Sequence, residues 1–154
     1  MNFLFTCIDT FTRFAFVRLL ESKHGQCAVK AFQSILEEAE TKPLMLVMDR
    51  GTEFYNNEFK SFCDSQGIKF FPPDYSSHGA YIERFNRTLQ GIMYKHMTQH
   101  ETYRYITLED NGKVYNMMPL FLATYYNSHH RMIGTTPAIA EEDESTHLEI
   151  RKKM

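Results

Sequence analysis

Two acidic residues stand where a carboxylate could be held rigidly for chemistry. Asp49 follows a short apolar run at residues 44–48 and lies in the stretch VMDRGTEF, while Glu83 opens a helical pattern in the stretch IERFNRTL. Mg²⁺ prefers oxygen ligands that include one or two carboxylates. A pair of such ions can stabilise both the attacking and the leaving oxygen of a phosphoryl transfer. The two segments therefore make Asp49 and Glu83 candidate metal ligands.

Each acid also has a purely structural interpretation. An aspartate at the end of a strand is most often a turn residue. A glutamate in the first turn of a helix commonly complements the positive end of the helix dipole. Either role is the more common one for a single acid taken alone. The two acids together, with the residues that flank them, favour the metal-site interpretation.

Hydrophobic periodicity predicts the elements that position these acids. Aromatic and β-branched residues predict strands at residues 3–8, 14–20, 44–48 and 68–71. Apolar spacings of three and four predict helices at 25–40, 57–66, from about 80 onward and at 114–126. We expect strand 44–48 to be buried on both faces and residues 101–113 to form a polar connection rich in turns. This order of elements predicts an α/β domain with helices packed on a mixed sheet.

Composition limits the class of protein. The chain has 154 residues, of which 43% are apolar and 23% charged, so one ordered domain is expected. Its formal charge of −2 excludes a strongly basic protein but allows local basic patches. The three cysteines are far apart and form no C-x-x-C pair, which is typical of reduced thiols in an intracellular protein. No apolar run approaches the ~18 residues that a membrane span requires, so no membrane partner is expected.

Four ordered motifs resemble the retroviral-type integrase catalytic core of the DDE superfamily. They are CIDTFTR at 7–13, MDRGTEF at 48–54, IERFNRTL at 82–89 and YNSHHRMIGTTP at 126–137. With TYRYI at 102–106, the set is most similar to integrases of Maverick/Polinton-type DNA transposons. The resemblance implies a ribonuclease-H-like fold. It places an integrase-like core at residues 1–140 and leaves 141–154 as a tail that we expect to be partly disordered.

The resemblance also implies an activity. Asp49 and Glu83 match the second catalytic aspartate and the catalytic glutamate of the family and would hold Mg²⁺ or Mn²⁺. The implied chemistry is 3′-end processing of the DNA of a mobile element, followed by strand transfer into target DNA. The implied partners are double-stranded DNA ends, target DNA and further copies of the chain. The implied location is the nucleus, or a virus or transposon particle.

The helix that begins near Glu83 carries the candidate DNA contacts. Asn86, Arg87 and Gln90 lie three, four and seven positions after Glu83, which puts them on one side of that helix. In the family this side meets DNA ends, and Arg84 joins the candidate set. Arg87 can pair with a phosphate, and Gln90 can contact a base or sugar edge. For Arg87 the structural alternative is an ion pair with Glu83, worth about 0.2–0.5 kcal/mol.

The first of the three acids in the family's site has no clear counterpart. Asp9 lies only 40 positions before Asp49, in a segment that resembles a turn between two later strands of the family's sheet. We expect Asp9 to accept backbone hydrogen bonds in an Asx turn, and Asp74 is the other acid to inspect. We therefore expect the chain to lack the first, central strand. Strand edges would then be unpaired, or the first hairpin would pair with strand 44–48.

Two further expectations follow from the residues. Because two carboxylates hold a metal pair poorly, catalysis is expected to be impaired. The alternative function is a catalytically inactive or domesticated integrase remnant that binds DNA or dimerises. His129 and His130 could suggest a zinc site, but no Cys pair stands at ligand spacing. We expect the two histidines to flank the end of a helix beside Arg131.

Overall fold

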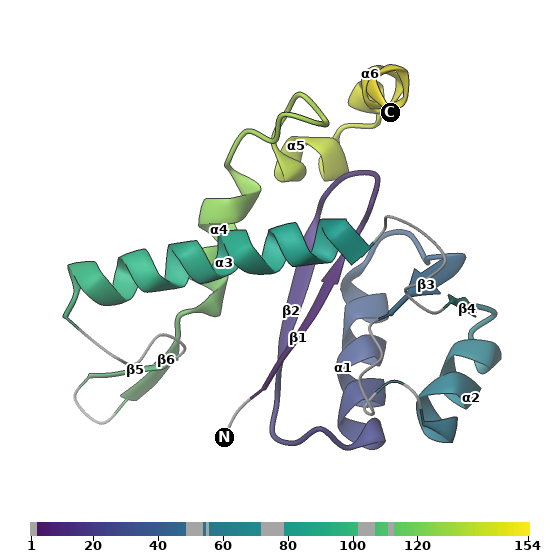
Figure 1. Cartoon of the computed structure of the whole chain (residues 1–154), viewed down its shortest axis with the longest axis horizontal. Coiled ribbons are helices and arrows are strands. Elements are labelled where there is room, and N and C mark those ends of the chain that lie inside the picture. Colours follow the sequence, from purple (N-terminus) through teal and green to yellow (C-terminus); the bar gives the residue numbers. More distant parts are fainter. Residues whose placement is uncertain (1–2, 49–53, 55, 72–78, 102–106, 111–112) are drawn as a thin grey trace. The chain divides into compact units, whose positions relative to one another are not determined.

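The chain folds into two compact units of helices and strands. The structure, a computed structural model, describes residues 3–48, 54, 56–71, 79–101, 107–110 and 113–154 (Figure 1). Residues 1–7 and 16–82 belong to the first unit, and residues 8–15 and 83–154 to the second. Each unit has a core of its own.

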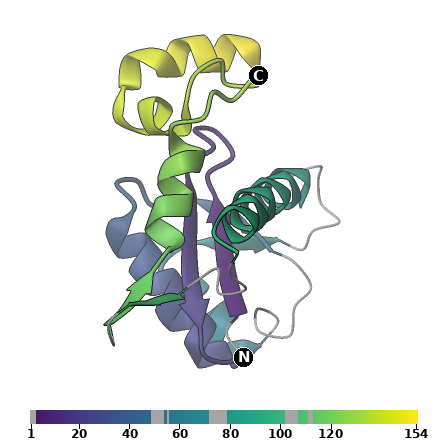
Figure 2. The ribbon, with the colours of Figure 1, turned by 90° about the vertical axis from the view of Figure 1, so that its left-hand side faces the viewer.

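Four strands, most of whose residues belong to the first unit, form two separate sheets. β1 (Phe3–Ile8) pairs with β2 (Ala15–Leu20), and the two strands lie side by side in Figure 2. β3 (Met45–Val47) pairs in parallel with β4 (Lys69–Phe71). Within the described ranges β1 pairs with no strand except β2, and β3 with none except β4. The hairpin therefore does not pair with β3 there, and β3 has an edge without a partner strand.

The expectation that strand 44–48 is buried on both faces is wrong. Leu46 and Met48 are buried, whereas Leu44 is 81% exposed and Met45 57% exposed. Successive side chains of a strand point to opposite faces. A sheet of two strands covers too little area to bury both faces, unlike the larger parallel sheets in which such apolar strands are usual.

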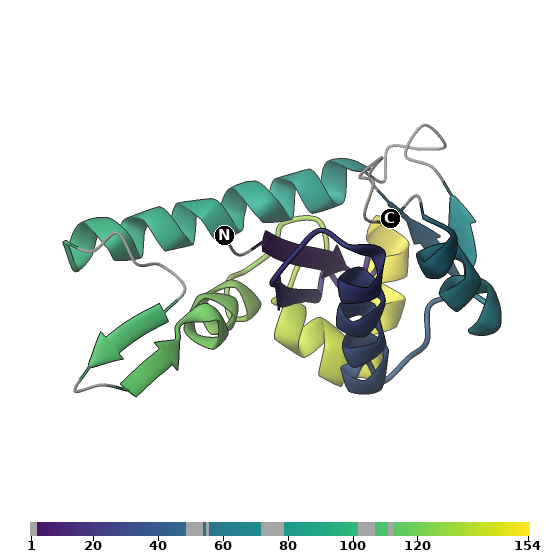
Figure 3. The same cartoon turned by 90° about the horizontal axis from the view of Figure 1, so that it is seen from below.

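An aromatic cluster fills the core of the first unit. α1 (Gly25–Glu38) lies beside the β1–β2 pair (Figure 3), and its Phe32 ring is 6.4 Å from the Phe5 ring. α2 (Asn57–Ser65) brings the Phe59 ring to 5.6 Å from Phe32. Tilted and edge-on aromatic pairs stabilise a core by about 0.5–1.5 kcal/mol each beyond the area that they bury.

Both ends of α2 are fixed by residues that favour helix termini. The Asn56 side chain accepts a hydrogen bond from the N–H of Phe59 at 2.8 Å, which is an N-cap. At the other end, the N–H groups of Gly67 and Ile68 donate to carbonyls of the last turn at 3.0 and 2.9 Å. Gly67 has φ +69°, so this is a Schellman motif that directs the chain into β4.

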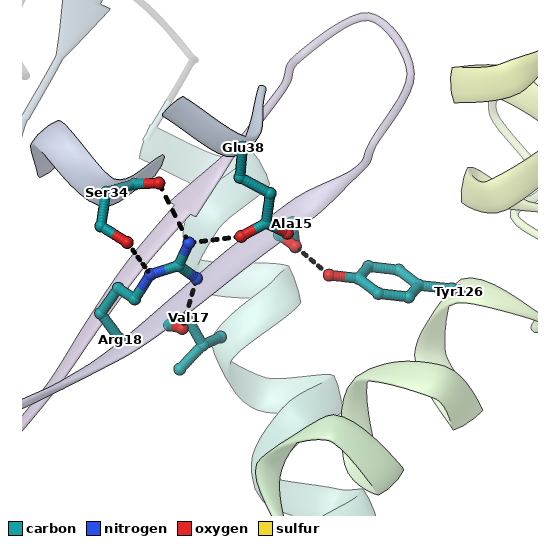
Figure 4. A network of polar contacts seen from close by, with 6 residues as sticks. All are labelled: Ala15, Val17, Arg18, Ser34, Glu38 and Tyr126. Carbon is teal, nitrogen blue, oxygen red and sulfur yellow. Dashed lines mark hydrogen bonds and ion pairs between the residues drawn. The ribbon is translucent and has the colours of Figure 1, made fainter. Parts of the chain in front are cut away.

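Arg18 on β2 links that strand to α1. Its Nε donates to Ser34 Oγ at 3.0 Å, and a terminal nitrogen donates to the Ser34 carbonyl at 3.3 Å (Figure 4). The guanidinium also forms an ion pair with Glu38, which is about half exposed. An exposed ion pair of this kind contributes only about 0–1 kcal/mol. The hydrogen bonds to Ser34 therefore fix the strand on the helix more than the charge pair does.

Two helices form the centre of the second unit. α3 (Gly79–Gln99) is continuous over 21 residues and buries Phe85, Leu89 and Met93. α4 (Met118–Tyr126) places the Tyr125 ring edge-on against Phe85, with 4.9 Å between ring centroids. The long helix predicted from about residue 80 onward is confirmed.

The expectation of a helix over residues 114–126 is wrong in its first part. β5 (Thr107–Asp110) and β6 (Lys113–Asn116) form an antiparallel pair, and α4 begins only at Met118. The Asn116 side chain accepts a hydrogen bond from the Met118 N–H at 2.9 Å. Pro119 fits in a first helical turn, where its missing N–H has no partner to lose, but it would disrupt a helix that started several residues earlier. The polar stretch that precedes α4 therefore forms strands.

The C-terminal residues are helical. α5 (Pro137–Glu142), the 3₁₀ turn η2 (Glu144–Thr146) and α6 (His147–Lys153) follow one another. Ile150 is fully buried in a cluster with Ile133 and Ala140, while Leu148 is 65% exposed. α6 is thus docked through Ile150 and through His147, whose ring lies edge-on to Phe11 with 5.1 Å between centroids. A domain boundary at residue 140 stays a prediction.

Membrane insertion and disulfides can be assessed only in the part of the chain that the structure describes. No helix there is both long and apolar enough to cross a membrane. Cys7, Cys27 and Cys63 all lie in that part and form no disulfide.

Candidate active site and nucleic-acid interface

The chain on both sides of Asp49 is well anchored. Asp49 itself lies outside the described residues. Before it, the buried Met48 donates its N–H to the Phe71 carbonyl at 3.3 Å. After it, the Phe54 ring packs edge-on against Phe5 at 5.5 Å and against Phe59 at 5.7 Å. The described residues on either side of Asp49, Met48 and Phe54, therefore pack within the first unit.

Glu83 and three of the candidate DNA contacts lie on the exposed side of α3. Glu83, Arg84, Arg87 and Gln90 are all exposed. In the described structure none of these four side chains has a hydrogen bond or an ion pair. Glu83 and Arg87 thus do not form the ion pair that their spacing allows. Their charges face solvent, where a ligand can reach them.

Asn86 lies at the border of that exposed side. It is half-buried, and its Oδ1 atom is shielded from solvent without a hydrogen-bond partner in the described structure. A buried, unpaired carbonyl oxygen costs about 1–3 kcal/mol. Spacing from Glu83 places Asn86 on the predicted side of the helix but does not reveal that this side chain is half-buried. A role of Asn86 in binding DNA stays a prediction.

Asp9 has the turn geometry that its sequence predicts. Its Oδ1 accepts hydrogen bonds from the N–H groups of Phe11 at 2.6 Å and Thr12 at 3.0 Å. The Asx turn is therefore confirmed. Asp74, the other acid considered, lies outside the described residues.

Two tyrosines of α4, which the sequence analysis missed, fix the loop after Asp9. The Tyr125 hydroxyl donates to the Arg13 carbonyl at 2.7 Å. The Tyr126 hydroxyl donates to the Ala15 carbonyl (Figure 4), and its ring stacks on Phe14 with 4.3 Å between centroids. The segment YN in the fourth motif was the available signal. These contacts hold residues 8–15 on α4 within the second unit.

His130 lies in a positively charged part of the second unit. The two histidines follow the end of α4, as expected, and His130 pairs with Thr135 through an N–H to carbonyl bond of 2.8 Å. Burial lowers the pKa of His130, and the positive charges of Arg13, Arg84 and His129 lower it further. Arg13 is itself 1% exposed. The environment of His130 therefore disfavours its protonated form.

Metal ligands can be sought only among the described residues. No three His, Cys, Asp or Glu side chains come together there. Glu83 offers an exposed carboxylate without an internal partner, which is the kind of ligand that Mg²⁺ uses together with water and substrate phosphates. The donor chemistry of Glu83 therefore fits such an ion, and Asp49 is the second ligand that the sequence predicts.

The fold belongs to a known class. Residues 2–74, a little under half of the chain, match the family described as Integrase core domain. The chain superposes on the HTLV-2 integrase catalytic core domain, solved with magnesium in a trimeric form, with a TM-score of 0.68. That pair is 24% identical and covers 90% of this chain and 84% of the viral one. The ribonuclease-H-like fold that the motifs predicted is confirmed.

Two further proteins extend this similarity. A chain of the simian T-cell lymphotropic virus intasome superposes with a TM-score of 0.73 at 17% identity, covering 91% of this chain and 48% of that one. A transposon-derived protein of Caenorhabditis elegans is 33% identical over 141 residues, which is 92% of this chain. This chain spans only 46% of that relative. The similarity is therefore to retroviral integrase cores in fold and to a transposon-derived protein in sequence.

Proposed function

We propose that this chain is a DNA integrase catalytic core that performs metal-dependent 3′-end processing and strand transfer for a mobile element. The observation that carries the proposal is the exposed side of α3. It presents the carboxylate of Glu83 next to Arg84 and Arg87, two cations that have no ion pair with any residue the structure describes. A carboxylate that can hold a divalent ion beside groups that bind phosphate is the combination that phosphoryl transfer on DNA requires.

In this proposal Asp49 and Glu83 hold Mg²⁺ or Mn²⁺. A bound ion of this kind stabilises charge on the attacking and leaving oxygens of a phosphodiester. Arg84 and Arg87 donate to phosphate oxygens and set the position of the strand, and Gln90 contacts a base or sugar edge. Asn86 would act beside Gln90. Catalysis then rests on alignment and charge stabilisation rather than on a covalent enzyme intermediate.

The two steps share one chemistry. In the first, water attacks a phosphodiester near the 3′ end, one P–O bond forms, and the P–O bond to the 3′ oxygen breaks. In the second, the freed 3′-hydroxyl attacks a target-DNA phosphate and displaces the 3′ oxygen of the target strand. Both steps need a phosphate group of the DNA to be held close to the Glu83 carboxylate. One site can therefore serve both.

The proposal extends to source and assembly. The motif at residues 102–106 supports a Maverick/Polinton-type element, whose integrase would act in the nucleus or in a virus or transposon particle. Joining two DNA ends in one event requires at least two protomers, so the chain is expected to act as a homo-oligomer. The trimeric form of the HTLV-2 core supports this expectation by analogy.

An inactive or domesticated remnant that binds DNA or dimerises is the second candidate. It is favoured by the turn role of Asp9, whose Oδ1 accepts two backbone hydrogen bonds. Asp9 is thereby a poor choice as the third carboxylate of a metal site. Such a remnant would still bind DNA through the cations of α3 but would not cleave or join it.

A strand-transfer assay separates the two candidates. Labelled duplex oligonucleotides are incubated with the protein in Mg²⁺ or Mn²⁺, alongside the variants Asp49→Asn, Glu83→Gln and the control Glu149→Gln. Metal-dependent joining that both site variants abolish and the control retains supports the integrase. DNA binding without any cleavage supports the remnant. Joining that is equal in the wild type and both site variants would overturn the assigned acids.

A further inference from the structure

Gly91 lies at the middle of the solvent-facing side of α3. The buried side of this helix consists of Phe85, Leu89 and Met93. At about 100° per residue, Gly91 points nearly opposite to that stripe. Gly91 is exposed, and it lies well inside a helix of 21 residues.

Nothing in the described chain requires a glycine at this position. A Cβ built on Gly91 meets no atom within 4 Å, and Gly91 is not among the residues with positive φ. Glycine weakens a helix interior relative to alanine, because it loses more backbone entropy on folding. Gly67 and Gly134, in contrast, have positive φ and are needed by their turns. The described structure therefore gives no internal reason for a glycine at this position.

Four exposed side chains surround the bare backbone at Gly91. Arg87 and Thr88 precede it by four and three residues, and Tyr94 and Lys95 follow it by three and four. Residues at these spacings are neighbours on a helix surface. In the described structure Arg87 and Lys95 form no hydrogen bond or ion pair, and Tyr94 is 60% exposed. These four side chains, which we call the frame of Gly91, thus offer two cations without partners in the described structure and an aromatic ring. They surround a stretch of backbone that a ligand can approach closely.

The charge of this side of the helix selects the partner. Arg84, Arg87 and Lys95 are exposed along α3, and Glu83 is its only acid, although the chain as a whole carries −2. Phosphate oxygens accept hydrogen bonds from guanidinium and ammonium groups. A sugar–phosphate backbone also needs room close to the helix, which a residue without a side chain provides.

We propose that Gly91 and its frame of Arg87, Thr88, Tyr94 and Lys95 form a docking point for the DNA backbone. This point extends the DNA contact along α3 to Lys95, about 18 Å from Glu83 at 1.5 Å per residue. The inference rests on the proposed function, because it takes α3 as the helix that faces DNA. It adds that affinity depends on the missing side chain at Gly91 as well as on the cations.

The test measures binding of a 30-base-pair duplex by fluorescence anisotropy, without divalent metal, at two salt concentrations. The variants are Gly91→Ala, Gly91→Leu and Lys95→Ala. The control is Ser61→Leu, which places the same side chain at an exposed position of α2. Thermal unfolding of each variant shows that it is folded.

We expect Gly91→Leu to weaken binding at least tenfold and Gly91→Ala several-fold, although alanine raises the unfolding temperature. Lys95→Ala should reduce the slope of log affinity against log salt by about 0.9, the value for one lost phosphate contact. Ser61→Leu should bind as the wild type does. Wild-type affinity in both Gly91 variants would overturn the inference. The inference would also be overturned if polyglutamate, added as a competitor at an equal charge, abolished binding of the duplex by the wild-type protein.

Failure of this inference is distinguishable from failure of the proposed function. Metal-dependent strand transfer that Gly91→Leu leaves unchanged overturns the docking point and leaves the integrase in place. Duplex binding that depends on Gly91, in a protein that never cleaves DNA, supports the docking point and overturns the catalytic proposal.

Discussion

The Tyr125 hydroxyl donates a buried hydrogen bond of 2.7 Å to the Arg13 carbonyl, joining residues that are 112 positions apart in the sequence. Arg13 has φ +61°, a conformation that non-glycine residues rarely adopt and that surrounding contacts must stabilise. The hydroxyl of Tyr125 supplies one such contact. The loop that carries Asp9 therefore depends on α4 for its shape.

Removing this hydroxyl should destabilise the protein. Tyr125→Phe keeps the ring against Phe85 but leaves the buried Arg13 carbonyl without its donor, at a cost of about 1–3 kcal/mol. The free energy of unfolding, measured in urea, should fall by that amount. The matched control is Tyr94→Phe, whose ring is exposed and whose change should stay within about 0.5 kcal/mol. Equal effects of the two substitutions would contradict the role given to Tyr125.

The stability of the protein should depend on pH through His130. Burial, followed by the charges of Arg13, Arg84 and His129, lowers the pKa of His130 below the ordinary value of 6.5. Below pH 6.5 the unfolded chain therefore binds a proton that the folded chain resists. The stabilising contribution is present above pH 6.5 and is lost as the pH falls through the folded value.

Denaturant unfolding at several pH values between 7.5 and about 5 tests this dependence. His130→Gln should flatten the acid-side loss of stability, whereas the same change at the exposed His100 should retain it. An NMR titration of the ring should give His130 a pKa below that of a free histidine. A normal pKa at His130 would contradict the environment given to its ring, in which burial acts first and the neighbouring cations second.

Ile150 should contribute more to the stability of the C-terminal helix than its exposed neighbours do. Ile150 is fully buried with Ile133 and Ala140, so Ile150→Ala should cost about 2–5 kcal/mol. Leu148 on the same helix is 65% exposed, and Leu148→Ala should change stability by less than about 0.5 kcal/mol. Unfolding in urea compares the two. Indistinguishable variants would favour the partly disordered tail expected from the sequence.

Two glycine substitutions should have opposite signs. Gly67 has φ +69° in the turn after α2, so Gly67→Ala should destabilise the protein by about 1–2 kcal/mol. Gly91 is helical with open space around it, so Gly91→Ala should stabilise by about 0.5–1 kcal/mol. Thermal unfolding measures both. A destabilising Gly91→Ala would mean that the chain itself needs this glycine.

Much of the fold could be predicted from the sequence, because its main elements are strongly periodic. The buried apolar residues of α3 recur at regular helical spacings. Pro43 marks the start of one predicted strand, and Pro72 marks the end of another. The pair β5–β6 could not be predicted, since its sequences, TLED and KVYN, show no regular alternation of apolar and polar residues. Pro119 was the signal that the helix after β6 starts late.

The residue types of the candidate site could be predicted from the sequence. The burial and the long-range contacts of these residues were harder to predict. The Asx turn at Asp9 follows from local chemistry and was predicted correctly. The hydrogen bond from Tyr125 to the Arg13 carbonyl could not be predicted, because only the folded chain brings these two residues together. The half-buried state of Asn86 likewise depends on how far α3 turns toward the core, which spacing along one helix does not specify.

Binding of Mn²⁺ tests most directly whether Asp49 and Glu83 share one metal site. Electron paramagnetic resonance measures free Mn²⁺ during titration of the wild type, Asp49→Asn, Glu83→Gln and the exposed-acid control Glu144→Gln, in the presence of duplex DNA. Loss of the same bound ion in Asp49→Asn and in Glu83→Gln, with the control unchanged, is the result that this account predicts. Binding that survives in both site variants would contradict it.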